Sequence, residues 1–321
     1  GPYAGLAYEM DDCNRRPNGG SGTMTLPMNK ALCAVGFLIV MLSGVATVHA
    51  SDSKDTNSAK VDGKNLANVP AATLRFFDAL EIRRELESLK DGAKKVGDML
   101  MGFVGTRDAS ALDSKQKKEL AQRLEVSKKE MAKCLDSSSI YKSFSAAFAL
   151  KLSAEKSEQL TTAYSAPAGQ QILQISRDAS TSGGAFAASS YFKEAFSKLS
   201  KAREEQVRMM VAASRYVDSR TRLTRNMMPA VLKIQHEKMT ESQLQNKMLA
   251  SQDEYVMEGL ATFAYGTRDL TRAEMTAVLK LYATPEHRAY IAAKNQALEP
   301  VTEALFQCLV SSLSSVTDEV R

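Results

Sequence analysis

"LSAEKSEQLTTAYSAP", residues 152–167, is the first of two copies of a sequence pattern that decides the fold. The second copy, "LTRAEMTAVLKLYATP", covers residues 270–285 and keeps the same spacing between its leucine, its tyrosine and its proline. A weaker similarity relates residues 103–108 to residues 263–269. Repetition at a fixed spacing indicates one supersecondary unit used twice, in which each copy buries the apolar side of the other.

Each copy predicts two helices joined by a tight corner. Ser153 and Thr271 are placed to cap the first helix, and Glu274 completes a Thr-x-x-Glu capping box in the second copy. Pro167 and Pro285 cannot continue that helix, but proline is favourable at the first turn of the next one. The sequence therefore predicts an all-α fold of two related modules, whose antiparallel helices pack as a bundle.

The rest of the chain supports the same class, because apolar residues recur at helical spacing and no strand-like alternation is found. Gly183-Gly184 separates two helical runs, and the run after it predicts a single long helix interrupted no later than Pro229. The apolar stripes of the two runs are Ile82, Leu86, Leu89, Ala93, Val96 and Leu100, and Phe192, Phe196, Leu199, Ala202 or Arg203, Val207 and Met210.

Composition divides the chain into five parts. Residues 1–27 resemble added or upstream sequence, 28–50 a signal peptide, and 51–69 a polar, disordered leader. Residues 70–182 are the first predicted helical module, and residues 185–321 are the second. We expect the core to come from the two modules alone.

The predicted signal peptide indicates where the protein works. Lys30 precedes the apolar run 31–45, and Val48-His49-Ala50 supplies small or apolar residues before a predicted cut after Ala50. The run is too short to cross a bilayer as a helix, so no transmembrane anchor is expected after cleavage. Cys33 lies at the start of the apolar run, which argues against lipid attachment. The sequence thus predicts a periplasmic or secreted protein.

The net charge of +5 is mild and spread along the chain. The densest basic spots are Lys115-Gln116-Lys117-Lys118 and the group of Arg220, Arg222 and Arg225, which solvated helix faces explain better than a binding patch does. Nucleic acid is therefore not expected as a partner. An envelope protein, a peptide or a lipid remains the expected class of partner.

Cys134 and Cys308 are the cysteines that follow the predicted leader. An oxidising compartment favours a disulfide between them. The competing interpretation is that both are small buried apolar residues. Two cysteines alone have no recognisable metal-site spacing.

No residue pattern points to a catalytic group, a cofactor or a metal. His236 and His287 are the histidines after the leader, and neither has a second ligand at helical spacing, so we expect them on the surface or in a capping role. The Gly-x-Ser-x-Gly motif of serine hydrolases and the glycine-rich loops that bind phosphate are not found in the sequence. The sequence therefore predicts no catalytic residue.

Two similar tetrapeptides, residues 105–108 and 266–269, could together build a polar site at helix ends. The favoured interpretation is structural, because Gly can end one helix while Thr or Asp caps the next. The charged residues concerned are Arg107, Asp108, Arg268 and Asp269.

Several aromatic residues admit two interpretations. Together with the methionines they could line a groove for a lipid or a peptide. The favoured interpretation is that they fill gaps between helices. These residues are Tyr164, Tyr282, Phe192, Phe196, Phe263 and Phe306.

The first corner, with its Leu-Ser-x-Glu start and residues 163–171, resembles the signature corner of a bacterial envelope family catalogued as domain of unknown function 2059. That family's pattern is a Leu-Thr start, a Tyr or other aromatic residue, two small residues, Pro and Gly. The second corner is similar, but His287 stands where the family tends to have Gly. The resemblance implies a secreted or periplasmic all-helical bacterial protein and brings no settled activity.

The sequence predicts a non-catalytic binding or interaction module of the bacterial cell envelope. One alternative is a cell-envelope hydrolase whose site is assembled from distant residues, which a polar cleft joining His236 or His287 to acidic residues would favour. Another is a carrier of lipids or other apolar ligands.

Overall fold

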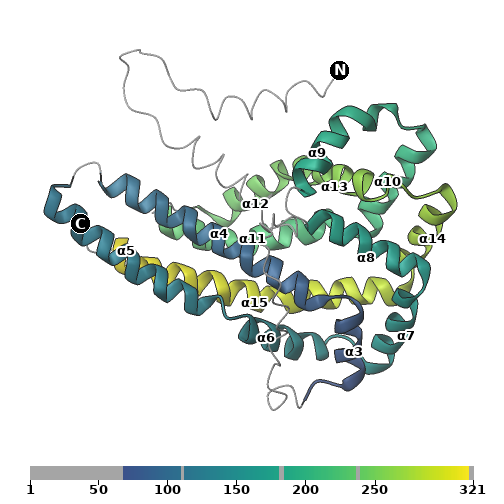
Figure 1. The fold of residues 1–321 in the computed structure, drawn as a ribbon, viewed down its shortest axis with the longest axis horizontal. Coiled ribbons are helices and arrows are strands. Elements are labelled where there is room, and N and C mark those ends of the chain that lie inside the picture. The colour runs from purple at the N-terminus through teal and green to yellow at the C-terminus, as the bar shows by residue number, and fades with distance from the viewer. Residues whose placement is uncertain (1–67, 110–111, 181–183, 236–238, 318–321) are drawn as a thin grey trace, which may run out of the picture.

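The computed structural model describes residues 68–109, 112–180, 184–235 and 239–317, and it confirms the all-α class. The predicted segments 1–27 and 28–50, and most of 51–69, lie outside the described residues. The α-helices, in the numbering of Figure 1, are α3 (Ala71–Ala79), α4 (Ile82–Ala109), α5 (Ser114–Cys134), α6 (Ser137–Ala149), α7 (Ala154–Ser165), α8 (Pro167–Ser180), α9 (Gly184–Ala195), α10 (Lys201–Ala213), α11 (Tyr216–Gln235), α12 (Glu241–Ala250), α13 (Gln252–Gly266), α14 (Arg272–Tyr282) and α15 (Pro285–Thr317).

The repeated pattern forms the corners that it predicts. Ser153 accepts a hydrogen bond from the backbone N–H of Lys156 at the start of α7, and Thr271 forms a capping box with Glu274 at the start of α14. Pro167 is the first residue of α8, and Pro285 is the first residue of α15. Local capping chemistry and proline therefore set the ends of these four helices.

The two longest helices run side by side in the same direction, with α5 antiparallel to both (Figure 1). The disulfide between Cys134 and Cys308 joins the end of α5 to α15 and confirms the predicted bridge. In the described ranges, no helix is long and apolar enough to pass through a membrane.

Buried side chains form two cores, and both α4 and α15 contribute to each. The first core includes Phe76 and Tyr164 from residues 70–182 and Val207 and Tyr290 from residues 185–321. The second core consists mainly of buried side chains from the later halves of α4 and α15 and from α5, α11 and α12. The predicted stripe on α4 is buried along its whole length: Ile82, Leu86, Leu89, Ala93, Val96 and Leu100.

The prediction of one long helix after residue 184 is wrong, although its interruption before Pro229 is confirmed. The run breaks between α9 and α10, where Ser200 leaves the helix and its hydroxyl caps α10 by accepting a hydrogen bond from the N–H of Arg203. A second break follows at Arg215, between α10 and α11, and Pro229 lies inside α11. The neighbouring Met227 and Met228 are buried in the second core, so packing offsets the hydrogen bond that proline cannot donate.

Candidate functional site

A cavity of about 300 Å³ lies among α4, α8, α11, α13 and α15. Residues from both predicted modules line it, including Glu85 and Tyr164 from the first and Phe263 and His287 from the second. Buried aromatic groups form one part of its wall, and charged groups at partly exposed positions form another. The cavity therefore has a deep aromatic end and a polar mouth.

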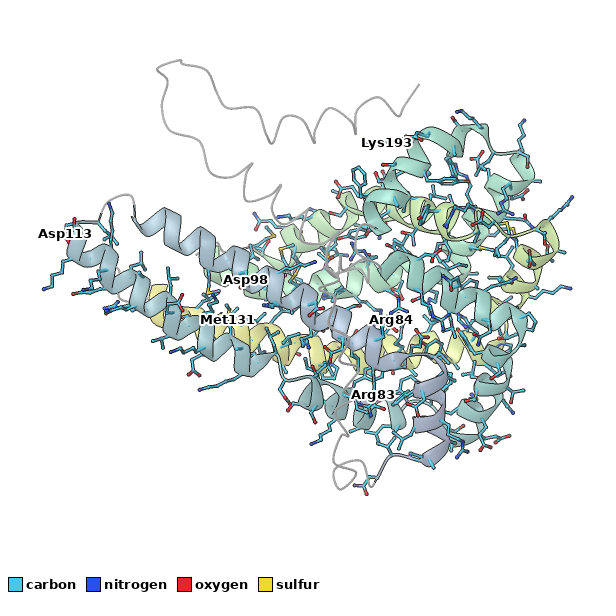
Figure 2. The ribbon with its side chains drawn as sticks, in the orientation of Figure 1. Arg83, Arg84, Asp98, Asp113, Met131 and Lys193 are labelled. Carbon is cyan, nitrogen blue, oxygen red and sulfur yellow. A yellow bond between two sulfur atoms is a disulfide. The ribbon has the colours of Figure 1, made fainter. Side chains whose placement is uncertain are left out.

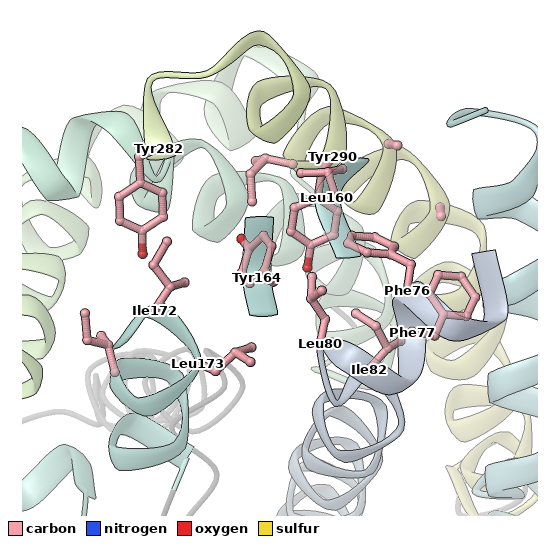
Figure 3. Packing of buried hydrophobic residues seen from close by; sticks show 14 of the residues in the cluster. Phe76, Phe77, Leu80, Ile82, Leu160, Tyr164, Ile172, Leu173, Tyr282 and Tyr290 are labelled. Carbon is pink, nitrogen blue, oxygen red and sulfur yellow. The ribbon is translucent and has the colours of Figure 1, made fainter. Parts of the chain in front are cut away.

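The deep end is built by the two repeated corners. Tyr164, near the end of α7, and Tyr282, at the end of α14, both pack against His287, with ring centroids 6.1 Å and 4.8 Å from the imidazole. Tyr290, one turn further along α15, lies 5.8 Å from the same ring. Figure 3 shows Tyr164 between Tyr282 and Tyr290. The equivalent tyrosines of the two copies thus converge on one histidine.

His287 is buried, with 1 % of its surface exposed, so the prediction of a surface position is wrong. Thr284 caps α15 by accepting a hydrogen bond from the N–H of His287, and this corner directs the first turn of the helix inward. The histidine follows Pro285 at the place that Gly169 takes after Pro167. That mismatch between otherwise similar copies was the sequence signal for a special role.

The corner around Gly169 leaves no space for a side chain at this position. A Cβ atom there would lie 2.2 Å from Tyr164 Cα and 2.6 Å from the carbonyl oxygen of Ala163. The first copy therefore needs glycine for close approach of α8 to the end of α7. The second copy has room for a side chain at the equivalent position, and His287 uses it.

The imidazole of His287 has one hydrogen-bonded nitrogen. Its Nδ1 lies 2.9 Å from the Tyr164 hydroxyl, while Nε2 is buried and has no hydrogen-bond partner in the described part of the chain. Burial, reinforced by the positive charge of Lys294, lowers the pKa of His287 to about 4. The ring is therefore neutral at pH 7 and carries one proton.

The Tyr164 hydroxyl decides which nitrogen holds that proton. Among the described residues its sole hydrogen-bond partner is His287, and burial holds the pKa of Tyr164 well above its usual value. The hydroxyl therefore keeps its proton. Donation of this proton to Nδ1 leaves one buried group without a partner, the N–H at Nε2, whereas the reverse arrangement leaves two, the hydroxyl hydrogen and the lone pair of Nε2. We assign the imidazole proton to Nε2, which makes this atom a buried donor without a partner, on a residue that lines the cavity.

The mouth of the cavity is lined by paired charges. Glu81 accepts hydrogen bonds from Arg84 at 2.9 Å and from Arg177 Nε at 3.0 Å, and the Arg177 contact lowers the pKa of Glu81. Lys294 lies 2.8 Å from Glu85. Figure 2 shows Arg83 and Arg84 leaving the start of α4, where Arg84 reaches α8 and Arg83 stacks over the ring of Tyr141 instead.

A buried ion pair supports the opposite wall. The guanidinium of Arg220 holds Glu258 through hydrogen bonds of 2.9 to 3.0 Å, and the two side chains are 4 % and 16 % exposed. Arg222 pairs with Glu299 at 2.8 Å nearer the solvent. An arginine fork that matches a carboxylate fixes the side chains of both partners. The α11 side of the cavity is thus rigidly defined.

Two helix-to-helix turns that border the cavity have backbone in the left-handed region. Glu81 has φ of 54° between α3 and α4, and Arg215 has φ of 55° between α10 and α11. Within the described ranges these are the non-glycine residues with positive φ. Glu81 lines the cavity, and Arg215 lies between the lining residues Ser214 and Tyr216. Each such conformation costs about 1 kcal/mol or more and is concentrated at functional sites in proteins.

The structure does not bring the two predicted polar tetrapeptides together. Arg107 and Asp108 belong to the last turns of α4, at the opposite side of the molecule from the connection between α13 and α14 (Figure 1). Arg268 contacts Asp178 and the ring of Tyr265. Asp269 is 84 % exposed in its side chain.

The remaining predicted site residues fall into three groups. His236 lies outside the described residues. Phe192 and Phe196 are half-buried, whereas Tyr164, Tyr282, Phe263 and Phe306 are buried as core residues. Within the described ranges, no three His, Cys, Asp or Glu side chains are grouped to hold a metal ion.

Comparisons with known proteins add no family to this description. The chain matches no family model, no curated protein and no solved structure. The resemblance of its corners to the domain of unknown function 2059 therefore stays a prediction. The cavity itself is the basis for a functional interpretation.

Acid is expected to destabilise the protein through His287. In the unfolded chain His287 is protonated below pH 6.5, whereas in the folded chain burial keeps it neutral down to about pH 4. The free energy of unfolding therefore falls as the pH drops through this window. The pKa difference corresponds to a loss of about 3 kcal/mol by pH 4. Lys294 adds repulsion, and the other groups facing the ring are Tyr164, Tyr282 and Tyr290.

Urea unfolding at several pH values measures this effect. The control is His287→Phe, which keeps an aromatic ring and removes the titrating group. The wild-type stability should fall by about 3 kcal/mol more than that of the variant between pH 7 and pH 4. Carboxylate protonation contributes to both proteins alike. Parallel curves for the two proteins would show that His287 is not held neutral by the fold.

Proposed function

We propose that this protein is an exported, non-catalytic binding protein of the bacterial cell envelope, periplasmic or secreted, that holds a small ligand in the cavity. One observation carries the proposal: His287 lines the cavity, and its buried Nε2 makes no hydrogen bond within the described part of the chain. A buried polar group without a partner costs free energy, and a ligand atom can remove that cost.

Other features agree with a preformed binding site. Cavities of roughly 300 to 1,000 Å³ are typical of small-molecule sites, and the volume here lies at the lower end of that range. The left-handed backbone at Glu81 and Arg215 places strain at two turns around the cavity. The predicted signal peptide and the disulfide support a location outside the cytoplasm, since disulfides persist in oxidising compartments.

A hydrolase is less well supported by the same geometry. A general base needs a pKa near the working pH, whereas burial lowers the pKa of His287 to about 4. The imidazole is held by the hydroxyl of Tyr164, in place of the carboxylate that orients a catalytic histidine in acyl transfer. A lipid carrier would need more room than this cavity offers.

A fragment screen tests the proposal. Ligand-observed NMR at pH 7 is expected to find fragments that bind the unmodified chain and lose binding in Ala179→Leu, because Ala179 lines the cavity and a larger side chain there occupies part of it. Hydrolysis of p-nitrophenyl acetate should be no faster with the unmodified chain than with His287→Phe. The proposal fails if no fragment distinguishes the two chains, or if ester hydrolysis depends on His287.

A further inference from the structure

We infer that the cavity selects an uncharged, ring-bearing ligand whose carbonyl or hydroxyl oxygen accepts a hydrogen bond from His287 Nε2. This inference rests on the proposed function and names the chemical class of its ligand. Three properties of the cavity support it: its charge balance, the free buried donor of His287, and its aromatic wall.

The charge balance disfavours ionic ligands. Every charged side chain that lines the cavity already has an oppositely charged partner at ion-pair distance. A ligand charge would therefore be buried without a counter-ion, or would have to break one of these pairs. The pairs are Arg84 with Glu81, Lys294 with Glu85, Arg222 with Glu299, and Arg220 with Glu258.

The free donor demands an acceptor. His287 lines the cavity and is 1 % exposed, and Tyr164 occupies its Nδ1, so an acceptor on a bound ligand would satisfy the N–H that no described residue accepts. An oxygen of a carbonyl or hydroxyl group accepts such a bond without bringing a charge. A purely apolar ligand would leave the donor unsatisfied.

The aromatic wall favours a ring. Tyr164, Tyr282 and Tyr290 surround the imidazole, and Phe263 lies 6.3 Å from the ring of Tyr282. Phe263 and Tyr282 meet nearly edge to face, at an interplanar angle of 83°. Rings in such surroundings gain edge-to-face contacts beyond the burial of their surface. The volume of about 300 Å³ suits a single ring with one polar substituent.

Three probes of equal shape test the charge requirement on the unmodified chain. Benzamide is neutral, benzoate carries a negative charge and benzamidine a positive one. At pH 7 benzamide is expected to bind at least about tenfold more tightly than either ion, measured by NMR titration. Tighter binding of benzoate or benzamidine would overturn the inference while leaving the binding function intact.

Toluene and His287→Phe test the acceptor requirement. The ratio of benzamide affinity to toluene affinity should fall about tenfold in His287→Phe, because the variant removes the donor and keeps the ring. Retained toluene binding shows that the variant's cavity is intact. The matched control is Ser145→Ala, which removes a buried hydroxyl that donates to Tyr141 at 2.7 Å on α6, away from the cavity. Its ratio should be unchanged.

The outcomes separate the inference from the function on which it rests. An unchanged ratio in His287→Phe overturns the role of Nε2. Binding of screened fragments without binding of benzamide overturns the ligand class alone. Failure of every fragment and of all four probes overturns the proposed function with it. If His287→Phe does not fold, the comparison of the three equal-shaped probes still decides the charge requirement.

Discussion

Replacing Gly169 by alanine is expected to lower the free energy of unfolding by more than about 4 kcal/mol, a loss that few single substitutions reach. The new Cβ would lie 2.2 Å from Tyr164 Cα and 2.6 Å from the carbonyl oxygens of Ala163 and Tyr164. All three are backbone atoms of the corner, so no side chain can rotate aside to make room. The turn between α7 and α8 must open, and Tyr164 must leave its position against His287.

Urea unfolding of Gly169→Ala measures this loss, and Gly102→Ala is the matched control. Gly102 lies inside α4, and a Cβ added there meets nothing within 4 Å. Alanine in an open helical position stabilises a protein by up to about 1 kcal/mol. The two identical changes should therefore have opposite signs. Similar effects of both would show that the first corner is looser than the structure has it.

Breaking the disulfide is expected to cost about 5 kcal/mol in the chain-entropy model. Cys134 and Cys308 are separated by 174 residues, so the bond closes a very long loop of the unfolded chain. The measurement is the urea midpoint of the oxidised protein against that of the reduced protein and of Cys134→Ala/Cys308→Ala. Reductant should have no effect on the double variant, which is the control for other actions of the reagent.

The same experiment distinguishes the two ends of the molecule. The bond ties α5 to α15 beside the second core, whereas the cavity lies beside the first. Benzamide affinity should therefore stay within about twofold while the reduced protein is folded, a change of under 1 kcal/mol. A midpoint that does not respond to reductant would contradict the predicted stabilisation.

Much of the fold followed from local rules in the sequence. The caps Ser153 and Thr271 and the prolines of the two corners act within a few residues, so their effects could be predicted without the structure. The stripe on α4 was readable for the same reason, because one face of a helix repeats at a fixed period. The break at Ser200 also had a local signal, since a serine before a charged first turn is a typical cap.

The site could not be read in this way. Tyr164 and His287 are 123 positions apart, and their contact depends on how α7 and α15 pack. The burial of His287 was not expected, because a histidine two residues after Pro285 and flanked by charged residues is typical of a surface turn. Left-handed backbone at Glu81 is equally hidden, since glutamate shows no preference for it.

Because α4 and α15 contribute buried side chains to both cores, the two ends of the molecule are structurally coupled. Neither core can unfold without displacing a helix that also belongs to the other core, so we expect the two cores to unfold together. The cavity and the disulfide-linked helices α5 and α15 would therefore become accessible to a protease in the same unfolding event. Such cooperative unfolding limits the partly open states that a protease could cut.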